Sequence, residues 1–172
     1  QGAGAFAACV RALRRAMPQV TVETLTPDFQ GREDLLNIVF TEKPDIFNHN
    51  IETVRRLTPH VRARATYDRS LGVLKRAATA GLKTKSGFMV GLGESWDEVH
   101  TALRDLASVG VSALTVGQYL PPTPDHYAVD RFYTLEEFGR LRDLAEPLFK
   151  RVQVGPLVRS SYHADEGRIH VL

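Results

Sequence analysis

The chain has 172 residues, of which 43% are hydrophobic and 24% charged, with a formal net charge of +2 at pH 7. These values are typical of one globular domain with a sizeable core, and the small charge gives no basis for binding nucleic acid or an anionic membrane. No apolar run approaches the roughly 18–20 residues that span a bilayer, so we expect no membrane association.

Short β-rich runs alternate along the chain with longer runs of helical period. The helical runs are Ala5–Met17, Arg32–Thr41, Asp68–Ala80, Trp96–Val109 and Leu135–Phe149. The predicted strands are Val20–Leu25, Ile46–His49, Thr84–Val90, Ser112–Val116 and Val152–Val154. Because the strands are apolar almost throughout, they favour parallel pairing under helices. Repeated strand–helix units of this kind predict an α/β sheet, open or closed into a barrel.

The first predicted helix carries the single cysteine, Cys9. One cysteine excludes an internal disulfide and an all-cysteine metal site within the chain, and it fits a cytoplasmic location. In an amphipathic helix, a buried and inert thiol is the expected state. The sequence opens on Gln1, enters this helix almost at once and has no initiator methionine, so we expect upstream sequence to be missing.

Several helix ends carry recognisable signals. Ser95–Glu98 and Thr134–Glu137 each form a capping box, with a hydroxyl at the N-cap and a glutamate three residues later. Gly81 and Gly110 follow helices at the position where a left-handed turn favours glycine. Asp68 is the predicted N-cap of the third helix.

Polar residues interrupt the first two strands. Glu23 lies in an apolar strand, where a carboxylate is costly unless paired, which favours a site or barrel-interior role over a partly exposed one. Asn48 and Asn50 share one side of their strand, and His49 faces the other. For His49 a hydrogen-bonded, semi-buried ring is the expected interpretation and a metal ligand the alternative, since no zinc-type histidine spacing occurs.

The segment Gly87-Phe-Met-Val-Gly-Leu-Gly-Glu94 leads from a strand through a glycine turn to a capped helix. A Rossmann fingerprint would need glycine where Trp96 stands, and a phosphate-binding loop would need Gly-Lys-Ser/Thr. Written as G-x-M-x-G-x-x-E, the segment is similar to the G-x-I-x-G-x-x-E strand of radical S-adenosylmethionine (SAM) enzymes. There it packs beside the adenine, and its glycines let the backbone approach the ring. An ordinary strand–turn–helix junction is the alternative.

Three further residues are candidates on position alone. Arg69 projects from the first turn of its helix, either towards a site or into solvent. Gln118 and Tyr119 leave the fourth strand for the proline loop Pro121–Pro124, where each either packs or binds. No G-x-S-x-G elbow or defensible Ser/His/Asp triad is present.

Taken in chain order, these segments resemble lipoyl synthases, which are radical SAM enzymes. The resemblance covers nearly the whole chain, and Phe47-Asn-His-Asn50 and Arg159-Ser-Ser-Tyr162 are specific to that family. It implies the C-terminal part of a partial (β/α)6 barrel, TIM-like in form, of which roughly the last four units are present. Residues 1–154 would form the barrel part and residues 155–172 a tail.

The resemblance also implies site residues. Gly87, Gly91 and Glu94 match the strand beside SAM, and three weaker matches to the SAM or substrate pocket are Asn48, Asn50 and Arg69.

In the tail, Ser161 best matches the serine that ligates an iron–sulfur cluster, with Ser160 as the fallback. Arg159 would hydrogen-bond near that cluster or fix the tail, and Tyr162 would either anchor the tail by packing or act at the site. The resemblance assigns no catalytic residue to this chain.

In the family, the complete enzyme inserts two sulfurs at carbons 6 and 8 of an octanoyl chain on a lysine of a carrier protein. One [4Fe–4S] cluster, held by a C-x-x-x-C-x-x-C loop, cleaves SAM. A second, auxiliary [4Fe–4S] cluster, held by a motif of three cysteines and by the tail serine, is consumed as sulfur donor. The implied partners are an octanoylated lipoyl-carrier protein or domain and an electron donor such as ferredoxin or flavodoxin. Both cysteine motifs are absent from this chain. We therefore expect no cluster to assemble on it alone, and no activity.

Two other interpretations stay open. The first is a non-catalytic remnant of a truncated lipoyl synthase gene that at most binds a lipoyl-carrier domain. The second is an unrelated βα-barrel enzyme acting on a phosphorylated metabolite, which would need an anion nest or a strand-end lysine that the sequence does not show. Without the opening strands, one sheet edge would be unpaired and apolar, so we expect the isolated chain to aggregate.

Overall fold

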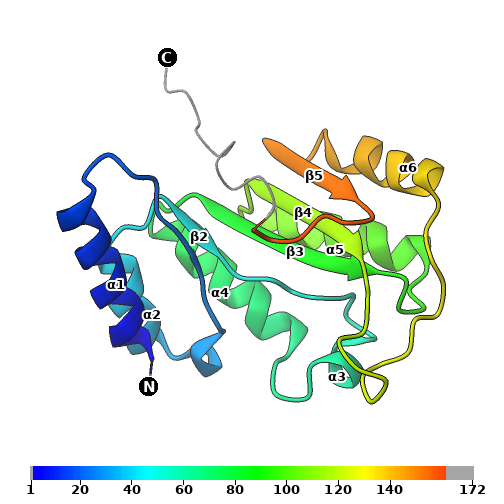
Figure 1. Ribbon diagram of the computed structural model, residues 1–172, viewed down its shortest axis with the longest axis horizontal. Helices are drawn as coiled ribbons and strands as arrows, with labels where there is room; N and C mark the ends of the chain where they lie inside the picture. Colours follow the sequence, from blue (N-terminus) through cyan, green and yellow to red (C-terminus); the bar gives the residue numbers. More distant parts are fainter. Residues whose placement is uncertain (1, 162–172) are drawn as a thin grey trace.

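A parallel five-stranded sheet forms the centre of the computed structural model, which describes residues 2–161 (Figure 1). The strands lie side by side in the order in which they occur in the chain, and every neighbouring pair is parallel. This arrangement is that of a barrel segment, which confirms the predicted fold class. The strands are β1 (Glu23–Leu25), β2 (Ile46–Asn48), β3 (Thr84–Val90), β4 (Ala113–Gln118) and β5 (Arg151–Gly155).

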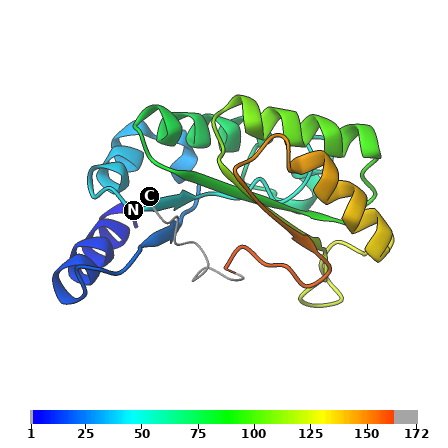
Figure 2. The same ribbon diagram turned by 90° about the horizontal axis from the view of Figure 1, so that it is seen from above.

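The connecting helices cover one face of this sheet (Figure 2), and the segment after β5 lies on the opposite face. All five predicted helices are present, with ends shifted by a few residues. Two short elements without a readable period were not predicted: the four-residue helix α3 and the single turn η1. The elements are α1 (Ala3–Ala16), η1 (Phe29–Gly31), α2 (Glu33–Thr41), α3 (Thr58–Val61), α4 (Tyr67–Thr79), α5 (Trp96–Ser108) and α6 (Leu135–Ala145).

The two faces of the sheet differ in chemistry. Phe47, Phe88 and Val116 face the helices and belong to the buried core. The predicted parallel pairing is confirmed, and nearly every residue of β3 and β4 is buried. The face away from the helices is not apolar throughout, because its side chains include Lys85 and Thr115, which are polar yet buried.

Most helix-end predictions are confirmed. Both capping boxes form, and Gly81 and Gly110 have φ of +81° and +90°. The prediction of Asp68 as an N-cap is wrong. The hydroxyl of Thr66 accepts the Arg69 N–H at 3.2 Å, because Thr66 stands at the last extended position before the helix, and Asp68 lies within the first turn.

The prediction of a buried Cys9 is also wrong. The buried side of α1 is formed by Ala3, Ala7 and Val10, which recur at helical spacing. Cys9 lies off that stripe and is exposed.

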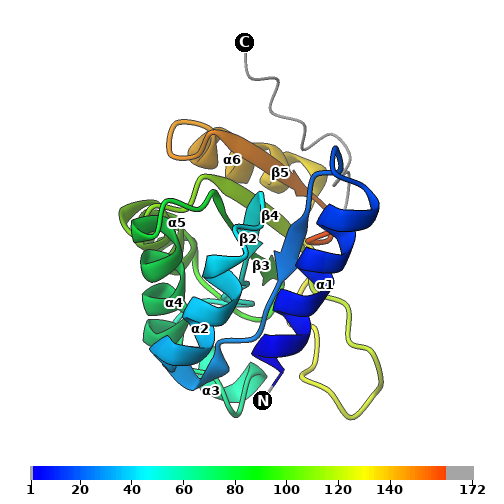
Figure 3. The ribbon, with the colours of Figure 1, turned by 90° about the vertical axis from the view of Figure 1, so that its left-hand side faces the viewer.

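The strand β1 forms one edge of the sheet, on the side that faces the viewer in Figure 3. Leu25 of this strand is 48% exposed. An edge strand with an exposed apolar side chain agrees with the expected unpaired edge. Within the described residues, no helix is long and apolar enough to cross a membrane.

Candidate functional site

A buried charged network lies on the sheet face that is not covered by helices. The Nζ atom of Lys85 on β3 is 3.1 Å from the Glu23 carboxylate on β1, and the lysine side chain is 7% exposed. The Asn48 side-chain amide donates to the same carboxylate at 2.7 Å. Glu23 is therefore paired inside the fold, as its place in an apolar strand predicted.

A cavity of about 100 Å³ opens further along the strands, towards their carboxyl ends. In parallel βα folds this is the end at which ligands bind. The cavity lies between β3, β4, the segment after β2 and the start of the C-terminal tail. Its lining includes Asn50, Glu52, Gly87, Met89, Thr115 and Arg159.

Gly87 brings bare backbone to this cavity. A Cβ at position 87 would lie 2.4 Å from Thr115 Oγ1 and 2.8 Å from the Thr115 carbonyl oxygen, so only glycine fits. The Asn50 Oδ1 atom is buried beside it and has no hydrogen-bond partner among the described residues. A ligand that offers an N–H or O–H group would satisfy this acceptor.

Glu52 adds a carboxyl group to the same cavity, although it was not among the predicted site residues. Its φ of +66° is in the left-handed region, which is strained for a residue with a side chain. Burial raises the pKa of its carboxyl, while the Arg62 charge and the Asn50 side chain act to lower it. Its position two residues after Asn50 was the only sequence signal, since a positive φ at a glutamate cannot be read from the sequence.

Glu94 closes the turn that follows β3. Its carboxylate accepts the backbone N–H groups of Gly91 at 2.7 Å and Leu92 at 2.9 Å, and the residue is buried. Gly91 has φ of +95°, and a Cβ there would lie 2.4 Å from the Arg131 carbonyl oxygen. Gly91 and Glu94 thus fix the backbone of the turn at the carboxyl end of β3. If they contribute to cofactor binding as predicted, they would do so by positioning this turn.

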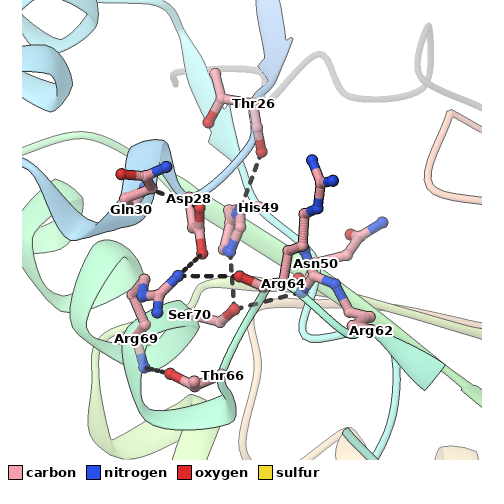
Figure 4. Close-up of polar contacts among 10 residues, drawn as sticks. All are labelled: Thr26, Asp28, Gln30, His49, Asn50, Arg62, Arg64, Thr66, Arg69 and Ser70. Atoms are coloured by element: carbon pink, nitrogen blue, oxygen red, sulfur yellow. Dashed lines mark hydrogen bonds and ion pairs between the residues drawn. The ribbon is translucent and has the colours of Figure 1, made fainter. Parts of the chain in front are cut away.

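His49 is held by protein groups at both ring nitrogens (Figure 4). Nδ1 lies 2.9 Å from the Thr26 carbonyl oxygen, and Nε2 lies 3.0 Å from Ser70 Oγ. Because a carbonyl can only accept, Nδ1 carries the hydrogen and Nε2 accepts from the serine. Burial lowers the pKa of this imidazole. The expected hydrogen bonding of the histidine is confirmed, although the residue is fully buried and not semi-buried. Both ring nitrogens that could bind a metal are taken.

Arg69 extends from α4 to the loop after β1. Its Nη1 atom donates to Asp28 Oδ2 at 3.0 Å and to the Arg64 carbonyl oxygen at 3.1 Å (Figure 4). The structure thus places Arg69 outside the cavity lining, although Asn48 and Asn50 share the open side of the sheet as predicted.

Gln118 and Tyr119 hold the segment that follows the proline loop. The Gln118 side chain donates to the Arg131 carbonyl oxygen at 3.1 Å and accepts the Tyr133 N–H at 3.0 Å. The Tyr119 hydroxyl donates to the Tyr127 carbonyl oxygen at 2.8 Å. For both residues the structure supports the packing interpretation.

The C-terminal tail crosses the open face of the sheet. The Ser160 carbonyl oxygen accepts from Lys85 Nζ at 2.6 Å, and Ser161 is exposed. Arg159 Nη1 donates to its neighbouring carbonyl, that of Val158, at 2.7 Å. The described residues contain no group of three or more histidine, cysteine or acidic side chains placed to hold a metal. Tyr162 and the rest of the tail lie outside the described residues.

The chain is similar to known radical SAM proteins over most of its length. The sequence pattern of the radical SAM superfamily matches residues 3–106. Lipoyl synthases from Rubrobacter xylanophilus and Bacillus subtilis are 54% and 51% identical to the chain in alignments of 168 residues that cover 96% of the chain. The chain spans about half of these relatives, 52% and 56% of their respective lengths. The predicted family resemblance is confirmed.

Solved structures share the fold. Methylornithine synthase (PylB) superposes with a TM-score of 0.70 at 18% identity, covering 86% of this chain and 44% of the other. SuiB of Streptococcus suis, in a structure bound to S-adenosylmethionine, superposes with a TM-score of 0.65 at 13% identity, covering 81% of this chain and 32% of the other. At these identities the likeness shows the fold alone.

Proposed function

Because the chain belongs to the radical SAM superfamily, we propose that it is the C-terminal part of a lipoyl synthase. The complete enzyme would insert two sulfurs at carbons 6 and 8 of a protein-bound octanoyl group. The observation that carries this proposal is the identity of 54% with a curated lipoyl synthase across 96% of the chain. The packed Gly87 strand and the Arg159-Ser160-Ser161 segment on the open sheet face support the same conclusion.

We assign the SAM side of the site to the cavity beside β3. Gly87 has no Cβ, so the flat adenine ring of SAM could pack directly against its backbone. The Asn50 Oδ1 atom, which has no partner among the described residues, could accept a hydrogen bond from an N–H or O–H group of the ligand. A cavity of about 100 Å³ holds part of such a ligand, so the remainder would lie over the open sheet face. When bound, SAM supplies the radical that abstracts hydrogen from the octanoyl chain. Arg69, paired with Asp28, would support the rim rather than contact SAM.

We assign the auxiliary-cluster side to Ser161. Lys85 engages the carbonyl of Ser160, whereas the next residue, Ser161, is exposed and available to an incoming group. An alkoxide is a harder ligand for iron than a thiolate, so an iron bound to it would be released more readily when a neighbouring sulfide is attacked. The chain has one cysteine, so the thiolates for both [4Fe–4S] clusters would come from outside it. The chain alone would then hold neither cluster and would be inactive.

The implied partners follow from this reaction. An octanoylated lipoyl-carrier protein or domain would be the substrate, and a donor such as ferredoxin or flavodoxin would supply electrons. A cytoplasmic location fits both partners and the oxygen-sensitive clusters.

A chimeric protein tests the proposal. The amino-terminal half of the Rubrobacter xylanophilus lipoyl synthase is joined to this chain, and the relative's complete enzyme is measured in parallel. After anaerobic reconstitution, the chimera should contain two [4Fe–4S] clusters and convert an octanoyl-lysine peptide to its lipoyl form. Ser161→Ala should lose the auxiliary cluster, while Ser160→Ala should retain it. A monomeric, folded chimera that holds one cluster and makes no lipoyl product would favour the non-catalytic remnant.

A further inference from the structure

One ammonium group joins the sheet to the tail. Lys85 Nζ lies 3.1 Å from each carboxylate oxygen of Glu23 and donates to the Ser160 carbonyl oxygen at 2.6 Å, across 75 residues of sequence. With its side chain 7% exposed, the ammonium has lost most of its water. A buried ammonium needs protein partners for its three N–H groups, and here the tail backbone supplies one of them.

Other links between tail and sheet are weaker. The Pro156 carbonyl accepts from the Gln118 backbone N–H at 3.3 Å, at the very start of the tail. Arg159 Nη1 reaches the Gln118 carbonyl at 3.5 Å, which is the limit of a hydrogen bond. Among the described residues after Pro156, the bond from Lys85 to the Ser160 carbonyl is therefore the one short, charge-assisted hydrogen bond between the tail and the sheet.

Gly117 on β4 provides a second, independent sign that the tail is seated here. A Cβ at position 117 would lie 2.2 Å from the Val158 carbonyl oxygen. The tail backbone thus rests directly on the strand, at a point where a side chain would lift it away. The lysine holds the tail two residues further on.

We propose that Lys85 is a positioning residue that docks the tail through the Ser160 carbonyl. The lysine is itself held by the Glu23 carboxylate, which also accepts from the Asn48 side-chain amide. Docking fixes the backbone immediately before Ser161 and thereby sets where that hydroxyl points. The docking itself follows from the contacts above. Its consequence for a cluster at Ser161 rests on the proposed function.

Trypsin cleavage after Arg159 measures docking directly, because the cleaved bond adjoins the docked carbonyl. The experiment uses the chimera described above, freed of iron by chelation. Lys85→Met should be cleaved after Arg159 roughly 10-fold faster than the parent, since a lost charge-assisted bond raises the undocked population. The double variant Glu23→Gln/Lys85→Met leaves no unpaired carboxylate and should show the same increase. Lys83→Met, an exposed lysine at the entrance to the same strand, is the matched control and should leave cleavage after Arg159 unchanged.

Gly117→Ala should also speed this cleavage while Lys85 is intact. A merely structural lysine would speed cleavage at many sites and lower the thermal midpoint, whereas docking confines the effect to Arg159. Unchanged cleavage in both Lys85 variants, with their folds intact, would overturn the proposal.

A second measurement on reconstituted protein separates docking from the proposed function. If both hold, Lys85→Met should lose iron from the auxiliary cluster at least several-fold faster than the parent, while the SAM-binding cluster keeps its electron paramagnetic resonance spectrum. If the parent chimera forms no auxiliary cluster, the proposed function fails and the trypsin result still decides docking. If the tail is released but the auxiliary cluster is as durable as in the parent, the link from docking to Ser161 is wrong.

Discussion

The Thr115 side chain lies directly against the backbone of Gly87, across the contact between β4 and β3. A methyl group at position 87 would be 2.4 Å from Thr115 Oγ1. The two strands pair in register at these residues, so neither backbone can retreat without breaking the ladder between them. The floor of the cavity therefore depends on the absence of a side chain at Gly87.

Gly87→Ala should therefore destabilise the protein by about 1–3 kcal/mol, because it overpacks the centre of the sheet. If the proposed SAM site is correct, the same change should weaken SAM binding to the reconstituted chimera at least several-fold, because it fills the cavity floor. Urea unfolding and equilibrium binding of SAM measure the two effects. Gly139→Ala on α6 is the matched control: nothing lies within 4 Å of its added Cβ, so the same change should stabilise by about 0.5–1 kcal/mol. Equal effects of the two substitutions would contradict this account.

Gly91 and Gly93 form a natural pair for separating strain from collision. Both have φ of +95°, so alanine is strained at either position. At Gly91 the new Cβ would also lie 2.4 Å from the Arg131 carbonyl oxygen, whereas at Gly93 its nearest neighbour would be 3.6 Å away. Gly91→Ala should therefore lose about 1–3 kcal/mol more unfolding free energy than Gly93→Ala. Similar losses in urea unfolding would show that backbone strain alone makes both glycines necessary.

The order of helices and strands could be predicted from the sequence because the hydrophobic periods of helices and strands differ. Polar residues within the apolar strands gave further information about the site. Glu23 could be predicted to be paired, since an unpaired carboxylate in a buried strand is too costly. Its partner Lys85 could not, because the pairing depends on which strands become neighbours. The role of Glu52 was missed because its positive φ is set by tertiary contacts. The exposure of Cys9 was missed because tertiary contacts also decide which side of its helix is buried. The sequence showed the glycine turn after β3, but it could not show that Gly87 lines the cavity while Glu94 holds the backbone of the turn.

His49 should make stability depend on pH. Burial lowers the pKa of its imidazole in the folded state, so below about pH 6.5 the unfolded chain binds a proton that the folded chain does not. The contribution of His49 to the free energy of unfolding is complete above that pH. It is lost as the pH falls, by at most about 1.4 kcal/mol per pH unit. Urea unfolding between pH 7 and pH 5 measures this slope. His49→Gln, which keeps a donor and an acceptor, should flatten the curve, whereas His126→Gln, at an exposed position after the proline loop, should not. A parallel fall in the parent and in His49→Gln would assign the slope to other groups.

The edge strand β1 should govern association of the isolated chain. Its outer backbone groups have no strand beside them among the described residues, and Leu25 exposes 48% of its surface there. Together these features form a template for pairing with another chain. Leu25→Lys should therefore raise the concentration at which the isolated chain associates, as measured by light scattering, because charge on an edge opposes pairing. Leu135→Lys is the control: Leu135 is more exposed, at 77%, but it begins α6 and adjoins no free strand. If both lysines suppress association equally, general hydrophobicity is the cause, and the open sheet edge is not.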